Sequence, residues 1–178
     1  MKLVRNSLVG LAVLAVAVVV VAFMLPRVVT VERGTVIAAP PEKVFVHVNS
    51  LRRFNEWSPW YERDPAMEQS FEGPEEGVGA KMSWKSDNPD VGSGRQEIVD
   101  SVPNERVRVA LDFGDMGNGT AGYTLTPEGD GTKIVWDFRT DLGNNPVARY
   151  FGLMFDKWIG ADYEKGLARL KVLVESQP

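Results

Sequence analysis

Few residues in this chain have side chains that could carry chemistry. The sequence holds no cysteine and one histidine, His47. Thiolate zinc sites, iron–sulfur clusters, cysteine nucleophiles and multi-histidine metal centres are therefore excluded. His47 lies beside Val44 and Val48 on a predicted helix, and no second histidine or cysteine can join it. We interpret His47 as a structural residue and expect neither a metal site nor a cofactor.

Aromatic side chains fall on the apolar faces of several predicted strands. Ile134, Trp136 and Phe138 occupy every second position of residues 132–140, so a strand there places all three side chains on one face. The same pattern puts Trp84, Phe113 and Tyr123 on the apolar faces of other strands. Such a face either fills a core or lines a pocket for a small molecule, and the residues alone leave both interpretations open.

Tyr123 is the only titratable side chain that this parity places on the apolar side. An enzyme would need a positioned acid or base there. Because no Ser-His-Asp set or carboxylate pair of defined geometry is visible, we predict no catalytic residue.

The elements that position these residues form an α+β pattern over residues 28–178. The predicted strands are Val28–Ala38, Met67–Phe71, Ala80–Ser86, Arg95–Ser101, Arg106–Phe113, Thr120–Thr126 and Thr132–Thr140. A helical segment that begins at Pro40-Pro41 follows the first strand, and a loop over Phe54–Pro65 contains Trp60. Short connections rich in Gly, Asn and Pro favour an antiparallel meander, and the lack of helical crossovers argues against a parallel sheet.

From Asn145 to the C-terminus the spacing predicts helix, but its apolar stripe changes direction. Phe151, Phe155 and Trp158 lie within about 80° of Val147 on a helical wheel. Four later residues centre near the opposite side, at about 170°; they are Tyr163, Leu167, Leu170 and Val174. We therefore predict a kink, break or change of packing partner within Trp158–Asp162, where Gly160 lies. The first half would cap a cavity mouth, either as a static bend or as a gate.

The N-terminus carries an apolar run, Leu8–Leu25, of 18 residues without a polar side chain. As a helix it would span roughly 27 Å, close to the thickness of a bilayer core. A cleaved signal peptide is the alternative. The run exceeds the usual length of such a segment, however, and no small-x-small cleavage site closes it. We predict a single-pass membrane anchor in residues 1–27.

Charge indicates the orientation of this anchor and limits its partners. Lys2 and Arg5 precede the span, whereas Glu32 partly offsets Arg27 and Arg33 behind it. The positive-inside rule then places residues 28–178 outside the cytoplasm. The net charge of −4 argues against nucleic-acid binding, which needs a basic face.

Four short motifs accompany the order of the elements. They are Val-Ile-Ala-Ala-Pro-Pro-Glu-Lys-Val-Phe (36–45), Trp-Ser-Pro-Trp (57–60), Gly-Thr-Lys-Ile-Val-Trp (131–136) and Tyr-Glu-Lys-Gly-Leu-Ala-Arg-Leu-Lys (163–171). With them, residues 28–178 resemble the SRPBCC superfamily, also called START-like or polyketide cyclase/dehydrase-like. The resemblance implies a helix-grip fold, in which a curved antiparallel sheet of about six or seven strands wraps a long C-terminal helix. It implies binding of a lipid-like or polycyclic ligand more strongly than any one reaction.

Together these observations predict a membrane-anchored binding domain for a hydrophobic small molecule or lipid. The predicted cavity-lining residues are Trp60, Trp84, Phe113, Tyr123, Trp136, Phe151, Phe155 and Trp158. Two alternatives stay open: a polyketide cyclase/dehydratase-like enzyme, and an interaction module whose apolar groove receives a protein segment. A cavity of a few hundred cubic ångströms between sheet and helix would favour a ligand.

Overall fold

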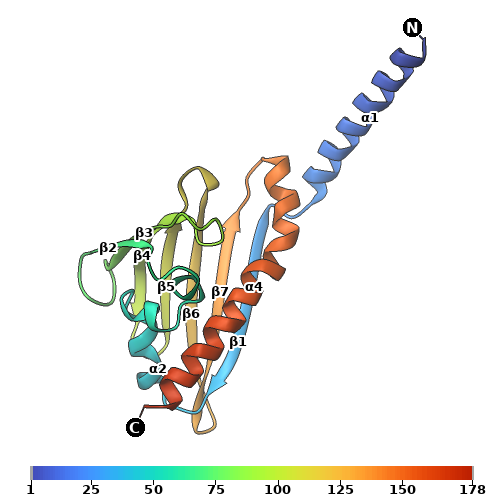
Figure 1. The fold of residues 1–178 in the computed structure, drawn as a ribbon. Helices are drawn as coiled ribbons and strands as arrows, with labels where there is room; N and C mark the ends of the chain where they lie inside the picture. The colour runs from blue at the N-terminus through green and yellow to red at the C-terminus, as the bar shows by residue number, and fades with distance from the viewer. Residues whose placement is uncertain (1, 178) are drawn as a thin grey trace.

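The computed structural model describes residues 2–177, with side chains from residue 6 to residue 177 (Figure 1). It begins with α1 (Lys2–Met24), which projects away from the rest of the molecule. Within α1, residues Asn6–Met24 are long and apolar enough to cross a membrane. Almost none of this segment is covered by the rest of the chain.

Seven strands form one antiparallel sheet. They are β1 (Val28–Ile37), β2 (Glu68–Glu72), β3 (Lys81–Lys85), β4 (Ser93–Val102), β5 (Arg106–Asp112), β6 (Asn118–Glu128) and β7 (Gly131–Asp141). Their order across the sheet is β1-β7-β6-β5-β4-β3-β2, with every neighbouring pair antiparallel. The α+β fold class and the strands expected from the sequence are confirmed.

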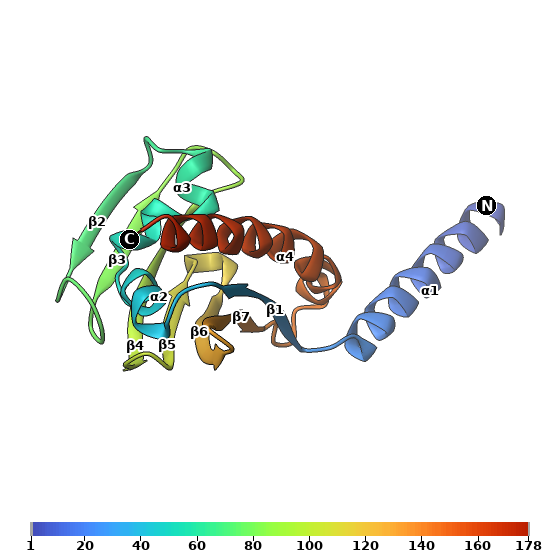
Figure 2. The same cartoon turned by 90° about the horizontal axis from the view of Figure 1, so that it is seen from below.

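The sheet curves around a long C-terminal helix, α4 (Pro146–Glu175), as Figure 2 shows. The inward face of the sheet carries the alternating apolar residues expected from the sequence. On β7, for example, Ile134, Trp136 and Phe138 are buried while Lys133 and Arg139 are exposed. Burial of this face against α4 supplies the main stabilising contribution, at about 25 cal/mol for each Å² of apolar surface removed from water.

The segment between β1 and β2 crosses from one edge of the sheet to the other. It holds α2 (Pro41–Val48), the 3-10 turn η1 (Arg53–Glu56) and α3 (Pro59–Arg63), whereas the sequence predicted a loop over Phe54–Pro65. The loop prediction was wrong because Ser58 caps α3 by accepting a hydrogen bond from the Tyr61 backbone N–H (3.3 Å). Pro59 at the first helical position supports the same start.

Of the kink, break or change of packing partner predicted within Trp158–Asp162, the break is wrong, because α4 is helical without interruption across it. Its buried residues share one face from end to end, from Gly152 through Gly160 to Val174. Gly160 lies on that face because the guanidinium of Arg33 crosses it: a Cβ there would lie 2.1 Å from Arg33 Nη2. Arg33 in turn bonds the carboxylates of Asp156 (2.9 Å) and Glu164 (2.6 Å). The glycine therefore accommodates an ion-pair network and does not end the helix.

Candidate functional site

A cavity of about 370 Å³ lies between the inward face of the sheet and α4. Roughly 300–1,000 Å³ is usual for a small-molecule site. Five strands, β3 to β7, contribute its wall on one side. The opposite wall comes from α4 and the segment around α3, and Met116 in the turn η2 (Gly114–Met116) completes the lining.

Seven of the eight residues predicted for this site line the cavity. They are Trp60, Trp84, Phe113, Tyr123, Trp136, Phe155 and Trp158. Phe151 does not line it, and 53% of its side chain is exposed. The reason is position along the helix: Trp158 shares this face of α4 and lines the cavity, whereas Phe151 lies about two turns nearer the start of the helix.

One end of the cavity is a close-packed aromatic cluster around Trp136. The indole of Trp136 stacks on the Tyr163 ring, with centroids 3.7 Å apart and planes 9° from parallel. Trp57 meets Trp136 edge-on at 5.1 Å, and Phe54 does so at 6.0 Å. Edge-on and stacked arrangements of this kind stabilise a core beyond the area that they bury. This wall is rigid, and Trp136 itself is 2% exposed.

The other end is formed by Trp84 and Phe113, whose rings meet edge-on at 6.1 Å. Trp84 lies across β4 because Gly94 has no side chain there: a Cβ on Gly94 would lie 2.6 Å from the indole. Thioethers from Met67, Met82 and Met116 complete this region. Methionine side chains adapt to irregular shapes, so this end can adjust to a ligand more readily than the Trp136 end.

Three buried polar groups lie along the aromatic wall. Burial raises the pKa of the Tyr123 phenol and that of the Tyr163 phenol well above the ordinary value of 10.0. Both tyrosines are therefore protonated at neutral pH and can donate hydrogen bonds. The indole Nε1 of Trp136 is buried without a hydrogen-bond partner. A ligand acceptor such as a carbonyl oxygen could satisfy these donors.

The one carboxylate among the residues that line the cavity, Asp162, is ion-paired with Arg63 from α3. Its Oδ2 accepts a hydrogen bond from Arg63 Nη1 at 3.0 Å. The pKa of Arg63 is raised chiefly by this bond, so its guanidinium stays charged. Asp162 is consequently engaged in joining α3 to α4.

Sequence reasoning missed part of the cavity lining. Phe54, Asn55 and Ser58 line it from the segment predicted as a loop, and Tyr163 lines it from α4. Strand parity does not apply to the segment over Phe54–Pro65, and the helical wheel assigned Tyr163 to the half of α4 away from the cavity mouth. The Trp-Ser-Pro-Trp motif was the available signal, because Ser58 and Trp60 both belong to it.

His47 lies outside the cavity and is fully buried. Its backbone carbonyl accepts a hydrogen bond from Trp57 Nε1 at 3.4 Å, which ties α2 to the aromatic cluster. Among the described residues, no group of three or more His, Cys, Asp or Glu side chains could hold a metal ion.

Solved structures with this fold resemble the chain at low sequence identity. Protein CV1439 from Chromobacterium violaceum is 21% identical, with a TM-score of 0.55 over 83% of this chain and 98% of its own. A Rhodobacter sphaeroides protein is 17% identical, with a TM-score of 0.60 over 84% and 94%. The di-domain ARO/CYC StfQ of the steffimycin biosynthetic pathway is 16% identical, with a TM-score of 0.61 over 83% and 51%. At these identities the likeness establishes the fold alone.

Family membership rests on sequence. No curated protein matches the chain. A family model described as polyketide cyclase/dehydrase and lipid transport matches residues 28–175, which include the whole sheet and α4. The resemblance to SRPBCC proteins is therefore confirmed, and the chain belongs to the polyketide cyclase/dehydrase and lipid transport family.

Proposed function

We propose that residues 28–178 bind a hydrophobic small molecule in the cavity between the sheet and α4. The observation that carries this proposal is the cavity of about 370 Å³, lined mainly by aromatic and methionine side chains. A merely structural core would fill such a volume, because protein interiors are packed as densely as organic crystals. The family description, which includes lipid transport, supports the same function.

The polar groups of the cavity define the chemistry of this ligand. Trp136 Nε1 is an unpartnered buried donor, and Tyr123 and Tyr163 are held in their protonated forms. These groups favour a ligand with an apolar body and an acceptor oxygen directed at the Trp136 end. An anionic headgroup would have no cation to meet inside, because Arg63 is paired with Asp162 at the wall.

We favour binding over catalysis on the same grounds. A cyclase or dehydratase would need a group that accepts a proton from its substrate. The buried tyrosines are protonated and Asp162 is engaged with Arg63. Tyr123 can donate a hydrogen bond but is not poised as a base.

The proposal includes attachment to a membrane through α1, with Leu8–Leu25 as the span. An isolated helix of valine, leucine and alanine has its backbone hydrogen bonds satisfied in lipid, where helix is the stable form. Its side chains are exposed from Leu8 to Val21, as contact with acyl chains requires, and Ala22 is buried near the end of the span. Residues 28–178 would then lie outside the cytoplasm.

Energy transfer from tryptophan to a dansyl-labelled fatty acid methyl ester, which is uncharged and carries an acceptor carbonyl, tests ligand binding on the full chain in lipid nanodiscs. Ala121 lines the cavity and is 6% exposed, so Ala121→Phe fills the site from β6. We expect Ala121→Phe to abolish saturable transfer while far-UV circular dichroism stays unchanged. The matched control is Val172→Phe, at an exposed position of α4, which should bind as the parent does.

Equal transfer in the parent and Ala121→Phe would contradict a ligand in this cavity. Mass spectrometry of the purified chain supplies a second readout: a copurified lipid supports the proposal. A stoichiometric protein segment in its place would support the interaction-module alternative.

A further inference from the structure

The first half of α4 exposes a row of large apolar side chains that nothing in the domain covers. Val147, Phe151, Met154 and Trp158 are 61%, 53%, 42% and 46% exposed. Their spacing of i, i+4, i+7 and i+11 puts all four on one face of the helix, within an arc of about 60°. We call them the α4 stripe. Single exposed apolar residues are common, but four on one face mark a contact surface.

The α4 stripe ends abruptly. The next residues on the same face are Asp162, Lys165 and Arg169, and all three are ion-paired with the α3 residues Glu62 and Arg63. One helix face is therefore apolar for about 16 Å and charged beyond Trp158. Such a change along one face is expected where a helix passes from a membrane interface into water.

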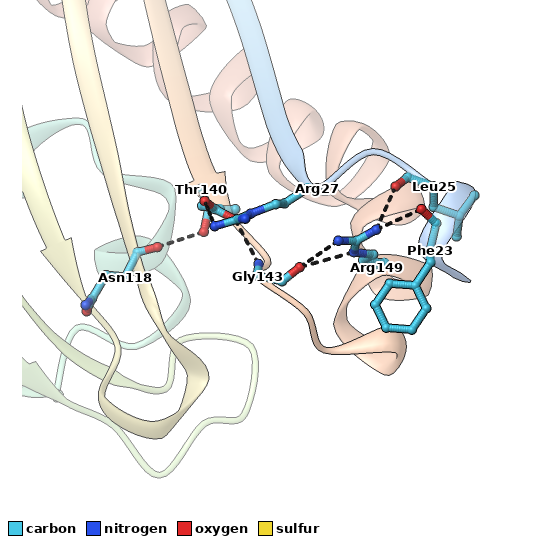
Figure 3. A network of polar contacts seen from close by, with 8 residues as sticks. Phe23, Leu25, Arg27, Asn118, Thr140, Gly143 and Arg149 are labelled. Atoms are coloured by element: carbon cyan, nitrogen blue, oxygen red, sulfur yellow. Dashed lines mark hydrogen bonds and ion pairs between the residues drawn. The ribbon is translucent and has the colours of Figure 1, made fainter. Parts of the chain in front are cut away.

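Contacts between α1 and α4 place the first residues of the α4 stripe beside the last residues of the proposed membrane span, Leu8–Leu25. Arg149, buried in the first turns of α4, donates to the backbone oxygens of Phe23 (3.0 Å) and Leu25 (3.4 Å), as Figure 3 shows. The Tyr150 hydroxyl donates to the Val18 oxygen at 2.8 Å. Val18 lies about 10 Å along α1 from Leu25, so the Tyr150 ring reaches alongside the span itself.

The polar residues nearby suit an interface rather than the bilayer centre. Arg149 is fully engaged, since it also bonds the Gly143 oxygen, and Arg27 is paired with Asp141. Asn144 and Asn145 precede the helix, and the Asn145 side chain accepts from the Val147 and Ala148 backbone N–H groups. Amides, tyrosine and tryptophan are well accommodated among lipid headgroups, with Phe151 and Met154 directed toward the acyl chains.

We propose that the α4 stripe lies in the interface of the leaflet at which α1 ends, and that the ligand enters the cavity from that leaflet. Trp158 connects the two parts of this proposal, because it belongs to the α4 stripe and also lines the cavity. Phe155 and Ile159 line the cavity on adjacent positions of α4. An apolar molecule can therefore pass from lipid to cavity along side chains of one helix. This inference rests on the proposed function, since it requires both the anchor and the ligand site.

The absence of cysteine allows single positions to be labelled without background. We would place one cysteine at residue 151 or 154 of the full chain (Phe151→Cys, Met154→Cys) and attach a nitroxide in phosphatidylcholine vesicles. The matched control is Val172→Cys. Val172 is 69% exposed and lies on the same helix beyond the charged residues Asp162, Lys165 and Arg169. Positions 151 and 154 should be more accessible to oxygen than to a water-soluble nickel chelate, and position 172 should show the reverse.

Function is tested by delivery of the dansyl-labelled fatty acid methyl ester from vesicles. We expect Val147→Ser/Met154→Ser to slow transfer from lipid into the cavity by about tenfold, because the variant weakens apolar contact with the leaflet. Binding of the same probe added from ethanol solution should keep the parent affinity, since neither residue lines the cavity. Val172→Ser should change neither quantity.

Each outcome bears on a distinct part of the proposal. Water-accessible labels at 151 and 154 in a chain that floats with the vesicles would overturn the α4 stripe as a membrane surface while leaving the anchor intact. Labels shielded from both reagents, with spin–spin broadening that depends on protein concentration, would overturn it in favour of pairing between copies. A chain that does not float, or a parent that does not bind the probe, would instead overturn the proposed function.

Discussion

Trp136 is the residue at which the packed core and the cavity meet. It lines the cavity, yet it is 2% exposed and stacks on Tyr163. Removal of its indole leaves a hole among Trp57, Phe54 and Tyr163 that those rings cannot collapse to fill. Trp158 also lines the cavity but is 46% exposed. Trp136 therefore contributes mainly to the packed core, whereas Trp158 contributes mainly to the cavity lining.

We expect Trp136→Ala to lower the free energy of unfolding by about 3–5 kcal/mol. Trp158→Ala is the matched control and should cost less than about 1 kcal/mol, since its side chain is half-exposed. Urea unfolding of the full chain in nanodiscs, followed by near-UV circular dichroism, measures both. Equal losses would show that Trp136 is not part of a close-packed core.

The buried phenol of Tyr123 predicts a loss of stability at alkaline pH. Its pKa is raised in the folded state by burial, so unfolding at high pH releases a proton that the folded chain retains. The stabilisation is complete below the unfolded pKa of about 10 and falls by up to about 1.4 kcal/mol per pH unit above it. We expect Tyr123→Phe to reduce this alkaline slope by one proton equivalent.

The slope is measured from urea unfolding at a series of pH values above 9. Trp158→Phe, which removes no ionisable group, should keep the parent slope. An unchanged slope in Tyr123→Phe would mean that this phenol ionises freely in the folded chain.

At the scale of elements, Gly166 and Gly160 of α4 lie against different kinds of neighbour. A Cβ on Gly166 would lie 2.8 Å from the Trp136 ring and 3.3 Å from Pro59 Cδ. Trp136 is held by its stack on Tyr163 and cannot move aside. A Cβ on Gly160 would meet only the guanidinium of Arg33, the far end of a flexible side chain.

Gly166→Ala should therefore destabilise the chain by about 1–3 kcal/mol, as overpacking does. Gly160→Ala should stay within about 1 kcal/mol of the parent, because the gain in helix propensity offsets displacement of Arg33. Thermal unfolding of the two variants side by side distinguishes them. A larger loss in Gly160→Ala would indicate that the Arg33 network, rather than Trp136, limits the approach of α4.

The strands could be predicted from sequence because each has one apolar face and is bounded by turn residues. The alternation of apolar residues along these strands alone places Trp84, Tyr123 and Trp136 on the inward face. The contribution of α3 could not be predicted, since Ser58 capping depends on a local geometry that period alone does not reveal.

Phe151 was wrongly predicted to line the cavity for a different reason. Apolar periodicity shows that Phe151 faces something apolar, but it does not distinguish a cavity from a lipid surface. The place of Phe151 along α4, about two turns before the cavity-lining Trp158, puts it outside the cavity, and that place relative to the sheet requires the packed structure.

For the whole molecule, the asymmetry of charge around Leu8–Leu25 predicts one topology. We expect alkaline phosphatase fused after Pro178 in a bacterial host to be active, and the corresponding cytoplasmic reporter to be silent. Arg27→Glu with Arg33→Glu should strengthen this preference, whereas Lys2→Glu with Arg5→Glu should weaken it. Activity of the cytoplasmic reporter alone would reverse the orientation.

The position of β1 in the sheet has a consequence for how the chain is made. β1 is an edge strand that pairs only with β7, and Val28 lies opposite Asp141. During synthesis β1 therefore emerges first among the strands, and its partner β7 emerges last. Until then Val29 and Val31 remain open to pairing with other chains, and α4 has no complete sheet to cover. The sheet is completed only by the final third of the chain, so interrupted synthesis would leave an aggregation-prone set of strands rather than a partly working protein.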